Sequence, residues 1–166
     1  MTTTLAPMTE AELLGWFASS KADYLNDLLR AGETRDQAQV SVDQSFERYF
    51  PAGVPTDNHL VFTVLTDGTP AGCLWIGPHS TEDNSAWWVW DIAINADHRG
   101  QGLGRAAMLL AEGVVRERGG TTLGLNVFGF NAPARGLYES LGYEVTSTRM
   151  LKKLTPQTPA ASPICP

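Results

Sequence analysis

The chain has 166 residues, of which 43% are hydrophobic and 18% are charged, and this balance suits one globular domain with a sizeable core. The formal net charge of −6 argues against a nucleic-acid partner, which normally requires a basic face. No apolar run is long enough to span a membrane, and residues 1–7 lack the basic start and apolar stretch of a signal peptide. We therefore expect a cytoplasmic protein without a membrane partner.

Hydrophobic periodicity and turn residues divide the chain into strands and helices. Strands are expected over residues 3–6, 60–66, 71–76, 86–94, 123–128 and 143–151, and helices between Thr9 and Gly32, from Thr34 to before Pro51, from Leu103 to Gly119, and between Asn131 and Gly142. Thr9 and Glu12 match a capping box, and we expect a break in the first helix near Ser19 and Ser20. The Asp67-Gly68 pair predicts a hairpin between two of the strands.

The end of the chain has a different composition from the rest. Residues 155–166 hold four prolines and no apolar periodicity, which is typical of a disordered tail. We therefore expect one domain over residues 1–154, followed by a proline-rich tail over residues 155–166.

Cysteine and histidine spacing predicts neither a disulfide framework nor a metal site. Cys73 falls in a predicted strand and Cys165 in the tail, so we expect free thiols. His59, His79 and His98 are far apart, and none has a ligand-like partner at short spacing. We expect no bound metal.

A glycine-rich turn separates the predicted strand 86–94 from the helix that follows it. Its sequence is Arg99-Gly100-Gln101-Gly102-Leu103-Gly104. The first N–H groups of a helix have no partner within it, and glycines let a phosphate approach them closely. The turn therefore predicts a phosphate site. The alternative is a turn that only tightens a strand–helix connection.

Two common phosphate-binding motifs do not fit this turn. A P-loop needs Lys-Ser or Lys-Thr after its last glycine, whereas Arg105 and Ala106 follow Gly104. A dinucleotide fingerprint needs G-x-G-x-x-G and an acidic residue about 20 positions further on. The spacing here is G-x-G-x-G, and residues 121–125 hold no carboxylate.

The turn resembles the acetyl-CoA-binding signature of the GCN5-related N-acetyltransferases (the GNAT family), Q/R-x-x-G-x-G/A. Arg99, Gly102 and Gly104 fill this signature. A second family element, N-x-x-A-x-x-L-Y-E-x-x-G-F/Y, is matched in register by Asn131, Ala134, Leu137, Tyr138, Glu139 and Gly142. Two linked motifs are far more specific than either alone, and the resemblance is strong over residues 60–151.

The resemblance implies an α/β fold of the GNAT type, with a mixed, mostly antiparallel central sheet flanked by helices. In this fold the central strand and the next one splay apart at their ends. The resemblance also implies acetyl-CoA as co-substrate, with its pantetheine arm along the backbone of Ile92, Ala93 and Ile94. Its pyrophosphate would lie on the amides of the glycine turn, with Arg105 nearby as a counter-charge. Asn131 would hydrogen-bond the cofactor arm, although a helix N-cap is its alternative role.

Tyr138 matches the position where the family often has a general acid that faces the thioester sulfur. A phenol with a reference pKa of about 10 is protonated at neutral pH and can donate a proton. The alternative is that Tyr138 only packs on its helix face with Leu137 and Leu141.

Asp91 is the only charged residue in the predicted strand 86–94. Relatives often carry a glutamate on this strand, and Ala93 stands at one such position. Asp91 lies two residues earlier on the same face. A lone carboxylate in apolar surroundings is costly unless it is partnered. We expect Asp91 to act as the general base or to form a structural ion pair with an arginine; a water relay is the other route for the proton.

The hypothesis from sequence is an acetyl-CoA-dependent N-acetyltransferase that acts on a primary amine of a small molecule or peptide. Two alternatives are a module that binds acyl-CoA without turnover and an acyltransferase for a larger acyl group. A homodimer is compatible with the sequence. The aromatic residues Trp75, Trp87, Trp88, Trp90 and Phe128 are either core residues or a wall that holds a cationic amine.

Overall fold

A computed structural model describes residues 1–80 and 83–154. Its elements in chain order are β1 (Thr3–Pro7), α1 (Glu10–Arg30), α2 (Arg35–Tyr49), the 3-10 turn η1 (Pro51–Gly53), β2 (Leu60–Thr66), β3 (Thr69–Pro78), β4 (Ala86–Ile94), the 3-10 turn η2 (Ala96–His98), α3 (Leu103–Glu117), β5 (Thr122–Leu125) and α4 (Ala132–Ser140). The strands form one sheet in the order β1-β2-β3-β4-β5, in which β4 and β5 are parallel and the other pairs antiparallel. This mixed sheet confirms the expected fold class.

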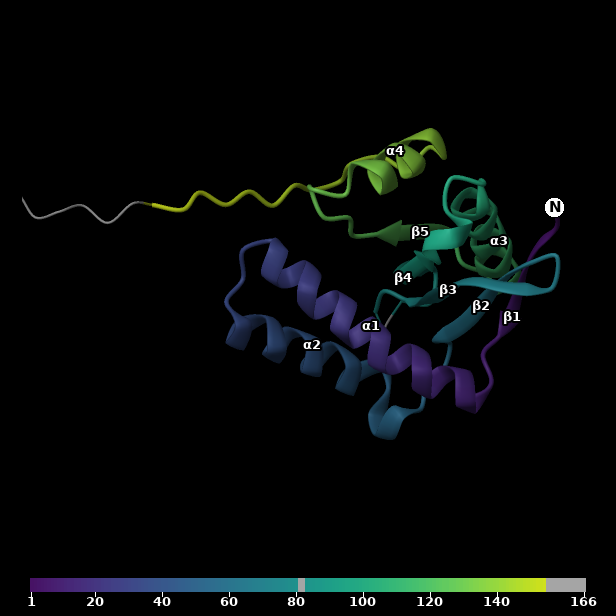
Figure 1. The fold of residues 1–166 in the computed structure, drawn as a ribbon, viewed down its shortest axis with the longest axis horizontal. Helices are drawn as coiled ribbons and strands as arrows, with labels where there is room; N and C mark the ends of the chain where they lie inside the picture. The colour runs from purple at the N-terminus through teal and green to yellow at the C-terminus, as the bar shows by residue number, and fades with distance from the viewer. Residues whose placement is uncertain (81–82, 155–166) are drawn as a thin grey trace, which may run out of the picture.

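The sheet is covered by helices on both faces (Figure 1). Alternate side chains of a strand point to opposite faces, so the central strands contribute side chains to a hydrophobic core on each face. Val61 and Trp75 pack under α1 and α2. Leu74 and Ile76 pack under α3 and α4. The sheet is therefore the central layer of a three-layer domain.

Helix α1 runs without a break, so the expected interruption near Ser19 and Ser20 is wrong. Serine disfavours a helix when its hydroxyl competes for backbone groups. Here the Ser19 hydroxyl donates back to the carbonyl of Trp16 at 2.9 Å, within the helix. The Ser20 hydroxyl leaves the helix and donates to Asp91 at 2.7 Å. Both hydroxyls are satisfied without opening the helix. The predicted capping box between Thr9 and Glu12 is present.

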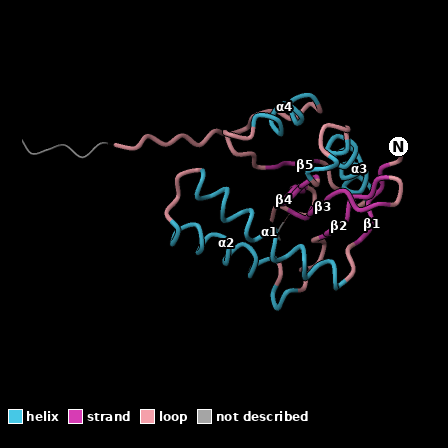
Figure 2. The backbone as a smooth tube through the Cα atoms, in the orientation of Figure 1, coloured by secondary structure: helices cyan, strands magenta, loops and turns pink. Residues whose placement is uncertain are grey.

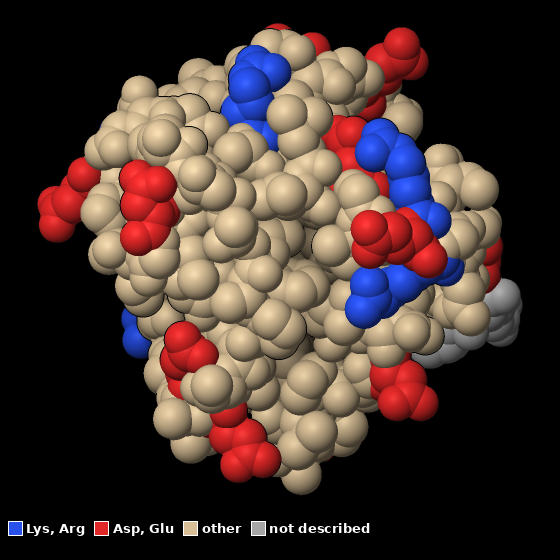
Figure 3. Space-filling view, turned by 90° about the vertical axis from the view of Figure 1, so that its right-hand side faces the viewer, with Lys and Arg blue, Asp and Glu red and all other residues tan. Residues whose placement is uncertain are grey.

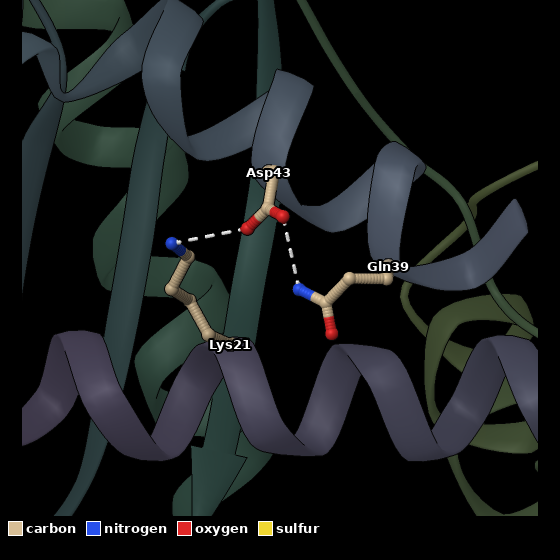
Figure 4. A network of polar contacts seen from close by, with 3 residues as sticks. All are labelled: Lys21, Gln39 and Asp43. Atoms are coloured by element: carbon tan, nitrogen blue, oxygen red, sulfur yellow. Dashed lines mark hydrogen bonds and ion pairs between the residues drawn. The ribbon is translucent and has the colours of Figure 1, made fainter. Parts of the chain in front are cut away.

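A polar network joins the two helices on this face (Figure 4). The ammonium of Lys21 on α1 lies 3.5 Å from one carboxylate oxygen of Asp43 on α2. The amide of Gln39 donates to the other oxygen of that carboxylate at 3.0 Å. These side chains are near solvent, so the pair contributes at most about 1 kcal/mol. Packing of the apolar helix faces holds α1 and α2 together.

The predicted hairpin is confirmed between β2 and β3. Asp67 and Gly68 have φ values of 48° and 83°, the left-handed conformation that a two-residue hairpin turn requires. Strand β3 continues to Pro78, two residues beyond the expected end at residue 76. It is lengthened because it pairs with β4 as far as Trp87.

Two expectations for the C-terminal third are wrong. Strand β5 ends at Leu125 rather than residue 128, because its pairing with β4 stops there. Residues 143–151, expected to form a final strand, have no regular secondary structure (Figure 2). In the described part of the chain this segment has no neighbouring strand, so it cannot form a ladder.

Charged side chains are scattered rather than grouped. On the face shown in Figure 3, Lys and Arg do not form a continuous basic patch and are interspersed with Asp and Glu. Within residues 1–80 and 83–154, no helix has the length and apolar character needed to cross a membrane. The same residues contain no cluster of His, Cys, Asp and Glu that could hold a metal ion.

Candidate active site

Strands β4 and β5 separate part-way along β4. Their parallel pairing runs only from Ala86 and Thr122 to Val89 and Leu125, whereas β4 continues to Ile94. Beyond Val89, β4 is paired among the described residues with β3 alone. The gap is the predicted splay.

Ile92, Ala93 and Ile94 line this gap with their backbone. All three are partly buried. Their strand has an open edge on the side that β5 has left. An extended ligand that contains amide groups can hydrogen-bond to such an edge as an added strand does.

A β-bulge bends β4 where the gap begins. Trp75 of β3 is opposite Asp91, and Ile76 is opposite Val89, so Trp90 is an extra residue in β4. A bulge increases local twist and turns a strand away from its neighbour. It also places Trp90 and Asp91 together on the α1–α2 side, since Trp90 packs with that core and Asp91 contacts α1.

The glycine turn joins the end of β4 to the start of α3. The Arg99 side chain donates to the carbonyl of Ile94 at 2.9 Å and fixes the turn to the strand, while Gln101 bonds back to the preceding turn. Gly100 and Gly102 have φ values of 75° and 82°. Gly102 is the N-cap of α3, and no side chain caps the helix. The first amides of α3 are therefore bare, as an anion site requires.

The rest of the turn anchors α3 against α4. Leu103 is fully buried. A Cβ on Gly104 would lie 3.3 Å from a methyl group of Leu137, so this glycine permits close approach of the two helices. The Arg105 guanidinium donates to the Ser140 hydroxyl at the end of α4. Arg105 is thus held beside the helix start.

Asn131 is the N-cap of α4. Its side-chain oxygen accepts a hydrogen bond from the amide of Ala134 at 3.3 Å. This is the structural role that the sequence offered as an alternative. Asn131 begins the helix that comes after β5 in the chain, and its role toward a cofactor arm remains a prediction.

Tyr138 lies on the inner face of α4. Its side chain is 9% exposed, and its ring centroid is 5.9 Å from that of Tyr143. Burial raises the pKa of the Tyr138 phenol, and the nearby charge of Asp91 raises it further. The phenol is therefore protonated at neutral pH and electrostatically coupled to Asp91.

Asp91 has neutral partners rather than an arginine. One carboxylate oxygen accepts hydrogen bonds from the Trp16 indole at 3.1 Å and the Ser20 hydroxyl at 2.7 Å. The expected ion pair is wrong, because the described ion pairs do not include Asp91. Burial raises the pKa of Asp91, and the two hydrogen bonds oppose that shift without cancelling it.

The aromatic residues divide between the two faces of the sheet. Trp87 is buried under α3, and Trp75 is buried under α1 and α2, so both are core residues. Trp90 is partly buried on the α1–α2 side, with its ring centroid 4.4 Å from Tyr49. Its indole nitrogen is buried and has no hydrogen-bond partner among the described groups.

A cavity of about 540 Å³ lies next to these rings. Its lining comes from the end of α2, the segment before β2 and the end of β3, and includes Arg48, Tyr49, Asp57, His59 and His79. The ring of Tyr49 stacks on that of His59 at 4.6 Å and joins the cavity to Trp90. The Tyr49 ring therefore lies between the cavity and the bulge in β4.

His59 is the buried polar group of this cavity. The Trp75 indole donates to its Nδ1 at 3.0 Å, so Nδ1 is an acceptor and the imidazole is neutral. Burial lowers the pKa of His59 to about 4. A Cβ on Gly77 would lie 2.6 Å from His59 Nδ1, so the glycine makes room for the ring.

The predicted site residues lie around the end of β4, on both sides of the sheet. The glycine turn leads from β4 into α3, and Tyr138 packs in the core under α3 and α4. Asp91 lies on the α1–α2 side, where it contacts Trp16 and Ser20 of α1. Sequence reasoning missed Tyr49 and His59. Both are far from the motifs in sequence, and a glycine beside a histidine across two strands gives no local signal.

Comparison with known proteins decides the family. The profile described as "Acetyltransferase (GNAT) family" matches residues 22–143. The chain belongs to the GNAT acetyltransferase family. The predicted resemblance is confirmed.

The GNAT chain is similar over almost its full length to YycN of Bacillus subtilis, named an uncharacterized N-acetyltransferase. The two are 29% identical over 156 residues, which cover 93% of this chain and 100% of YycN. The crystal structure of YycN superposes with a TM-score of 0.84 at 28% identity, covering 93% of this chain and 100% of YycN.

Two more distant GNAT proteins act on different acceptors. The ribosomal protein bS18-alanine N-acetyltransferase of Escherichia coli is 41% identical over 61 residues, which cover 37% of this chain and 41% of that enzyme. AAC(6')-Iy, solved with a bisubstrate analog of CoA and acetylneamine, shares the fold with a TM-score of 0.58 at 14% identity, covering 93% of this chain and 99% of its own.

Proposed function

We propose that this protein transfers the acetyl group of acetyl-CoA to the amine of a small molecule or peptide. The observation that carries the proposal is the continuity between the open edge of β4 and the bare N-terminus of α3. An amide-containing arm fits the first, and a pyrophosphate fits the second. A Cβ built on Gly100 or Gly102 would meet no atom within 4 Å, so the space beside the turn is open to the phosphates.

The thioester supplies an activated acyl group, and the protein supplies proton transfer and charge stabilisation. We assign the proton donor for the departing thiolate to Tyr138, because burial and the Asp91 charge keep its hydroxyl protonated. Amides on the open edge of β4 would polarise the thioester carbonyl, as oxyanion donors do. General acid catalysis of this kind contributes typically 10²–10⁴-fold to a rate.

We assign the proton acceptor to Asp91. Its hydrogen bonds to Trp16 and Ser20 fix the position of one carboxylate oxygen, and its raised pKa makes it a stronger base than an exposed aspartate. Ala93 offers no carboxylate for the task. The carboxylate would take the proton that an ammonium acceptor must lose before attack.

The acceptor would approach from the α1–α2 side. On that side the cavity lined by Tyr49 and His59 adjoins Trp90 and the bulge in β4. Aromatic faces attract ammonium groups within about 6 Å of the ring centroid. Asp57 adds a carboxylate at the cavity wall. A cationic amine is the acceptor class that this lining favours.

A thiol-release assay tests the proposal. The protein is incubated with acetyl-CoA and a panel of amino acids, polyamines, aminoglycosides and peptides with free N-termini. We expect CoA release above background with at least one amine, and no such release from the Gly102→Val variant. Calorimetric binding of acetyl-CoA without turnover across the panel would instead indicate a module that only binds acyl-CoA. Faster release from butyryl-CoA than from acetyl-CoA would indicate a larger acyl donor.

A further inference from the structure

Helix α1 supplies two hydrogen-bond donors to the Asp91 carboxylate. Trp16 and Ser20 are four residues apart in α1, so they lie on the same face of the helix. The Trp16 indole donates to Oδ2 of Asp91 at 3.1 Å, and the Ser20 hydroxyl donates to the same oxygen at 2.7 Å. The Cys73 thiol of β3 also donates to this oxygen, at 4.0 Å. Among the described residues, the side-chain hydrogen bonds to Asp91 therefore all end on Oδ2.

The two oxygens of Asp91 consequently differ in their surroundings. Oδ2 is occupied by fixed donors, whereas no described side chain donates to Oδ1. An oxygen that already accepts several hydrogen bonds is the poorer site for a proton, because those bonds stabilise its charged form. Asp91 is partly buried just beyond the point where β5 leaves β4. Oδ1 is therefore the oxygen that is left for an acceptor amine.

The donors to Asp91 are neutral, and this suits a base. An arginine or lysine beside the carboxylate would favour its ionised form and lower its pKa, so the carboxylate would take up a proton poorly. Hydroxyl, indole and thiol donors orient the carboxylate without adding a positive charge. Burial raises the pKa of the Cys73 thiol to about 12, so this group also stays neutral.

The titratable groups that act on Asp91 come from three elements. Burial raises the pKa of Asp91 most, and the like charge of Asp23 on α1 adds to this effect. The charge of Asp91 in turn raises the pKa of Cys73 on β3 and of Tyr138 on α4. The Ser20 hydroxyl is the strongest of the influences that lower the pKa of Asp91. None of the described groups that act on this pKa is a cation.

Helix α1 is fixed to the sheet close to these donors. Oε1 of Glu12 accepts a hydrogen bond from the Thr63 hydroxyl of β2 at 3.2 Å. Trp16 lies one turn further along α1, with its ring centroid 5.4 Å from that of Phe50 and 5.7 Å from that of Trp75. The donors therefore belong to a well-packed element, which precise positioning of a reactive group requires.

We propose that Ser20 is a positioning residue for proton transfer: its hydroxyl holds Oδ2 of Asp91, so that Oδ1 takes the proton of the acceptor amine. This inference rests on the proposed function, in which Asp91 is the base. An N–H bond of the ammonium breaks, an O–H bond forms at Oδ1, and the electron pair stays on nitrogen for attack on the thioester carbon. Asp91 then releases its proton to solvent. Amide formation releases a second proton, which balances the one that Tyr138 gives to the thiolate.

A titration of Asp91 by NMR tests the hydrogen bond directly. The aspartate carboxyl groups are isotopically labelled, and the Asp91 resonance is identified by its absence from Asp91→Asn. We expect the pKa of Asp91 to rise by about 1 in Ser20→Ala, because the lost hydrogen bond stabilises the ionised form.

The chain offers a matched control in the neighbouring serine. Ser19 is exposed, and its hydroxyl donates to the Trp16 carbonyl at 2.9 Å within the helix. Ser19→Ala should therefore leave the pKa of Asp91 at the parent value. Ser20→Thr keeps a hydroxyl at the buried position and should restore that value.

The pH dependence of turnover connects the hydrogen bond to the reaction. It is measured with an amine that supports CoA release from the parent. In Ser20→Ala we expect the acidic limb of the kcat–pH profile to move to higher pH by the same amount as the pKa of Asp91. The KM for acetyl-CoA should stay at the parent value. Ser20→Thr should return the limb to the parent position, and Ser19→Ala should not move it.

Two results would overturn the inference. Equal Asp91 pKa values in the parent and Ser20→Ala would show that the hydroxyl does not act on the carboxylate, even if Tm falls. A raised pKa with an unmoved acidic limb would show that Asp91 is not the base, and Ser20 would then have a structural role only. Failure of the proposed function is distinguishable from the first result. A parent that releases no CoA with any amine would overturn the activity, while the pKa of Asp91 would still rise in Ser20→Ala.

Discussion

At the scale of single residues, Tyr138 and Tyr143 form a matched pair. Their ring centroids are 5.9 Å apart on the same side of the sheet, and we propose Tyr138 alone as the donor to a leaving thiolate. We expect Tyr138→Phe to lower kcat by 10²–10⁴-fold, typical of a lost general acid, with little change in Tm or in the Kd of acetyl-CoA. The measurement is kcat, Kd and Tm on one preparation.

Tyr143→Phe is the control for this substitution. The Tyr143 hydroxyl is buried and has no hydrogen-bond partner among the described groups. Removing such a hydroxyl relieves a desolvation cost of about 1–3 kcal/mol, so Tm should hold or rise while kcat stays at the parent value. Parent-level turnover in Tyr138→Phe would exclude the proton-donor assignment.

Asp91 can be tested without disturbing its anchors. In Asp91→Asn the side-chain oxygen still accepts hydrogen bonds from Trp16 and Ser20. Because burial raises the pKa of Asp91, its ionised form is disfavoured in the folded state at neutral pH, and that cost falls as the pH decreases through the raised pKa. We therefore expect Asn to leave Tm equal or higher.

If Asp91 is the base, Asp91→Asn loses turnover by about 10²-fold or more and loses the acidic limb of the kcat–pH profile. Asp91→Ala serves as the structural control, since it should lower Tm as well by leaving Trp16 and Ser20 without an acceptor. Unchanged kcat in Asp91→Asn would favour a water relay.

His59 gives the fold a pH dependence of defined sign. Burial lowers its pKa to about 4, whereas an unfolded histidine has a pKa of about 6.5. The contribution of neutral His59 to the free energy of unfolding is complete above a pH of about 6.5. It is lost as the pH falls toward 4, and the total loss is about 3 kcal/mol. The raised pKa values of Asp91 and Asp27 act in the opposite direction over the acidic range.

The comparison of the parent with His59→Gln isolates this term. Glutamine keeps an acceptor for the Trp75 indole but does not titrate. Urea unfolding at several pH values should give a parent that loses more free energy of unfolding than the variant between pH 6.5 and pH 4. If the free energies of unfolding of parent and variant changed in parallel with pH, the pKa of His59 would be the same in the folded and unfolded states.

At the scale of the elements, the two ends of α3 carry the same backbone strain in different surroundings. Gly102 precedes the helix with φ +82°, Gly119 follows it with φ +79°, and a Cβ would meet no atom within 4 Å at either position. Valine at either site should cost about 1–2 kcal/mol of stability, since left-handed backbone disfavours a side chain. Calorimetry should show weakened acetyl-CoA binding for Gly102→Val alone.

Equal acetyl-CoA affinities in the Gly102→Val and Gly119→Val variants would show that the phosphates do not bind at the start of α3. Gly104→Val is a poorer test of phosphate binding than Gly102→Val. Its side chain would also press on Leu137, which lies 3.3 Å from the added Cβ, and so would disturb the packing of α4 as well.

Local patterns were sufficient for most elements and for the glycine turn at the start of α3. Capping residues, the Asp67-Gly68 turn and the glycine motif act over a few residues, so the sequence shows them directly. The errors came from long-range partners. The Ser20 hydroxyl is satisfied by Asp91, 71 residues away, which no helix rule anticipates. Residues 143–151 have the composition of a strand, but a strand needs an edge, and composition does not say where that edge is.

At the scale of the whole molecule, the sheet separates two groups of candidate site residues. The α3–α4 face holds the motif residues and the bare helix start, and these could be predicted because the family motif specifies them. The α1–α2 face holds Asp91, Trp90 and the cavity with His59. Its residues come from distant segments of the chain, so the proposed acceptor side could not be predicted from residue spacing.

The tail prediction belongs to the whole chain as well. Residues 155–166 lie outside the described residues, and their four prolines without apolar periodicity predict that they are dispensable. Deletion from Thr155 should therefore leave Tm and the Kd of acetyl-CoA unchanged. A Tm lower by several degrees after this deletion would show that the tail packs on the domain.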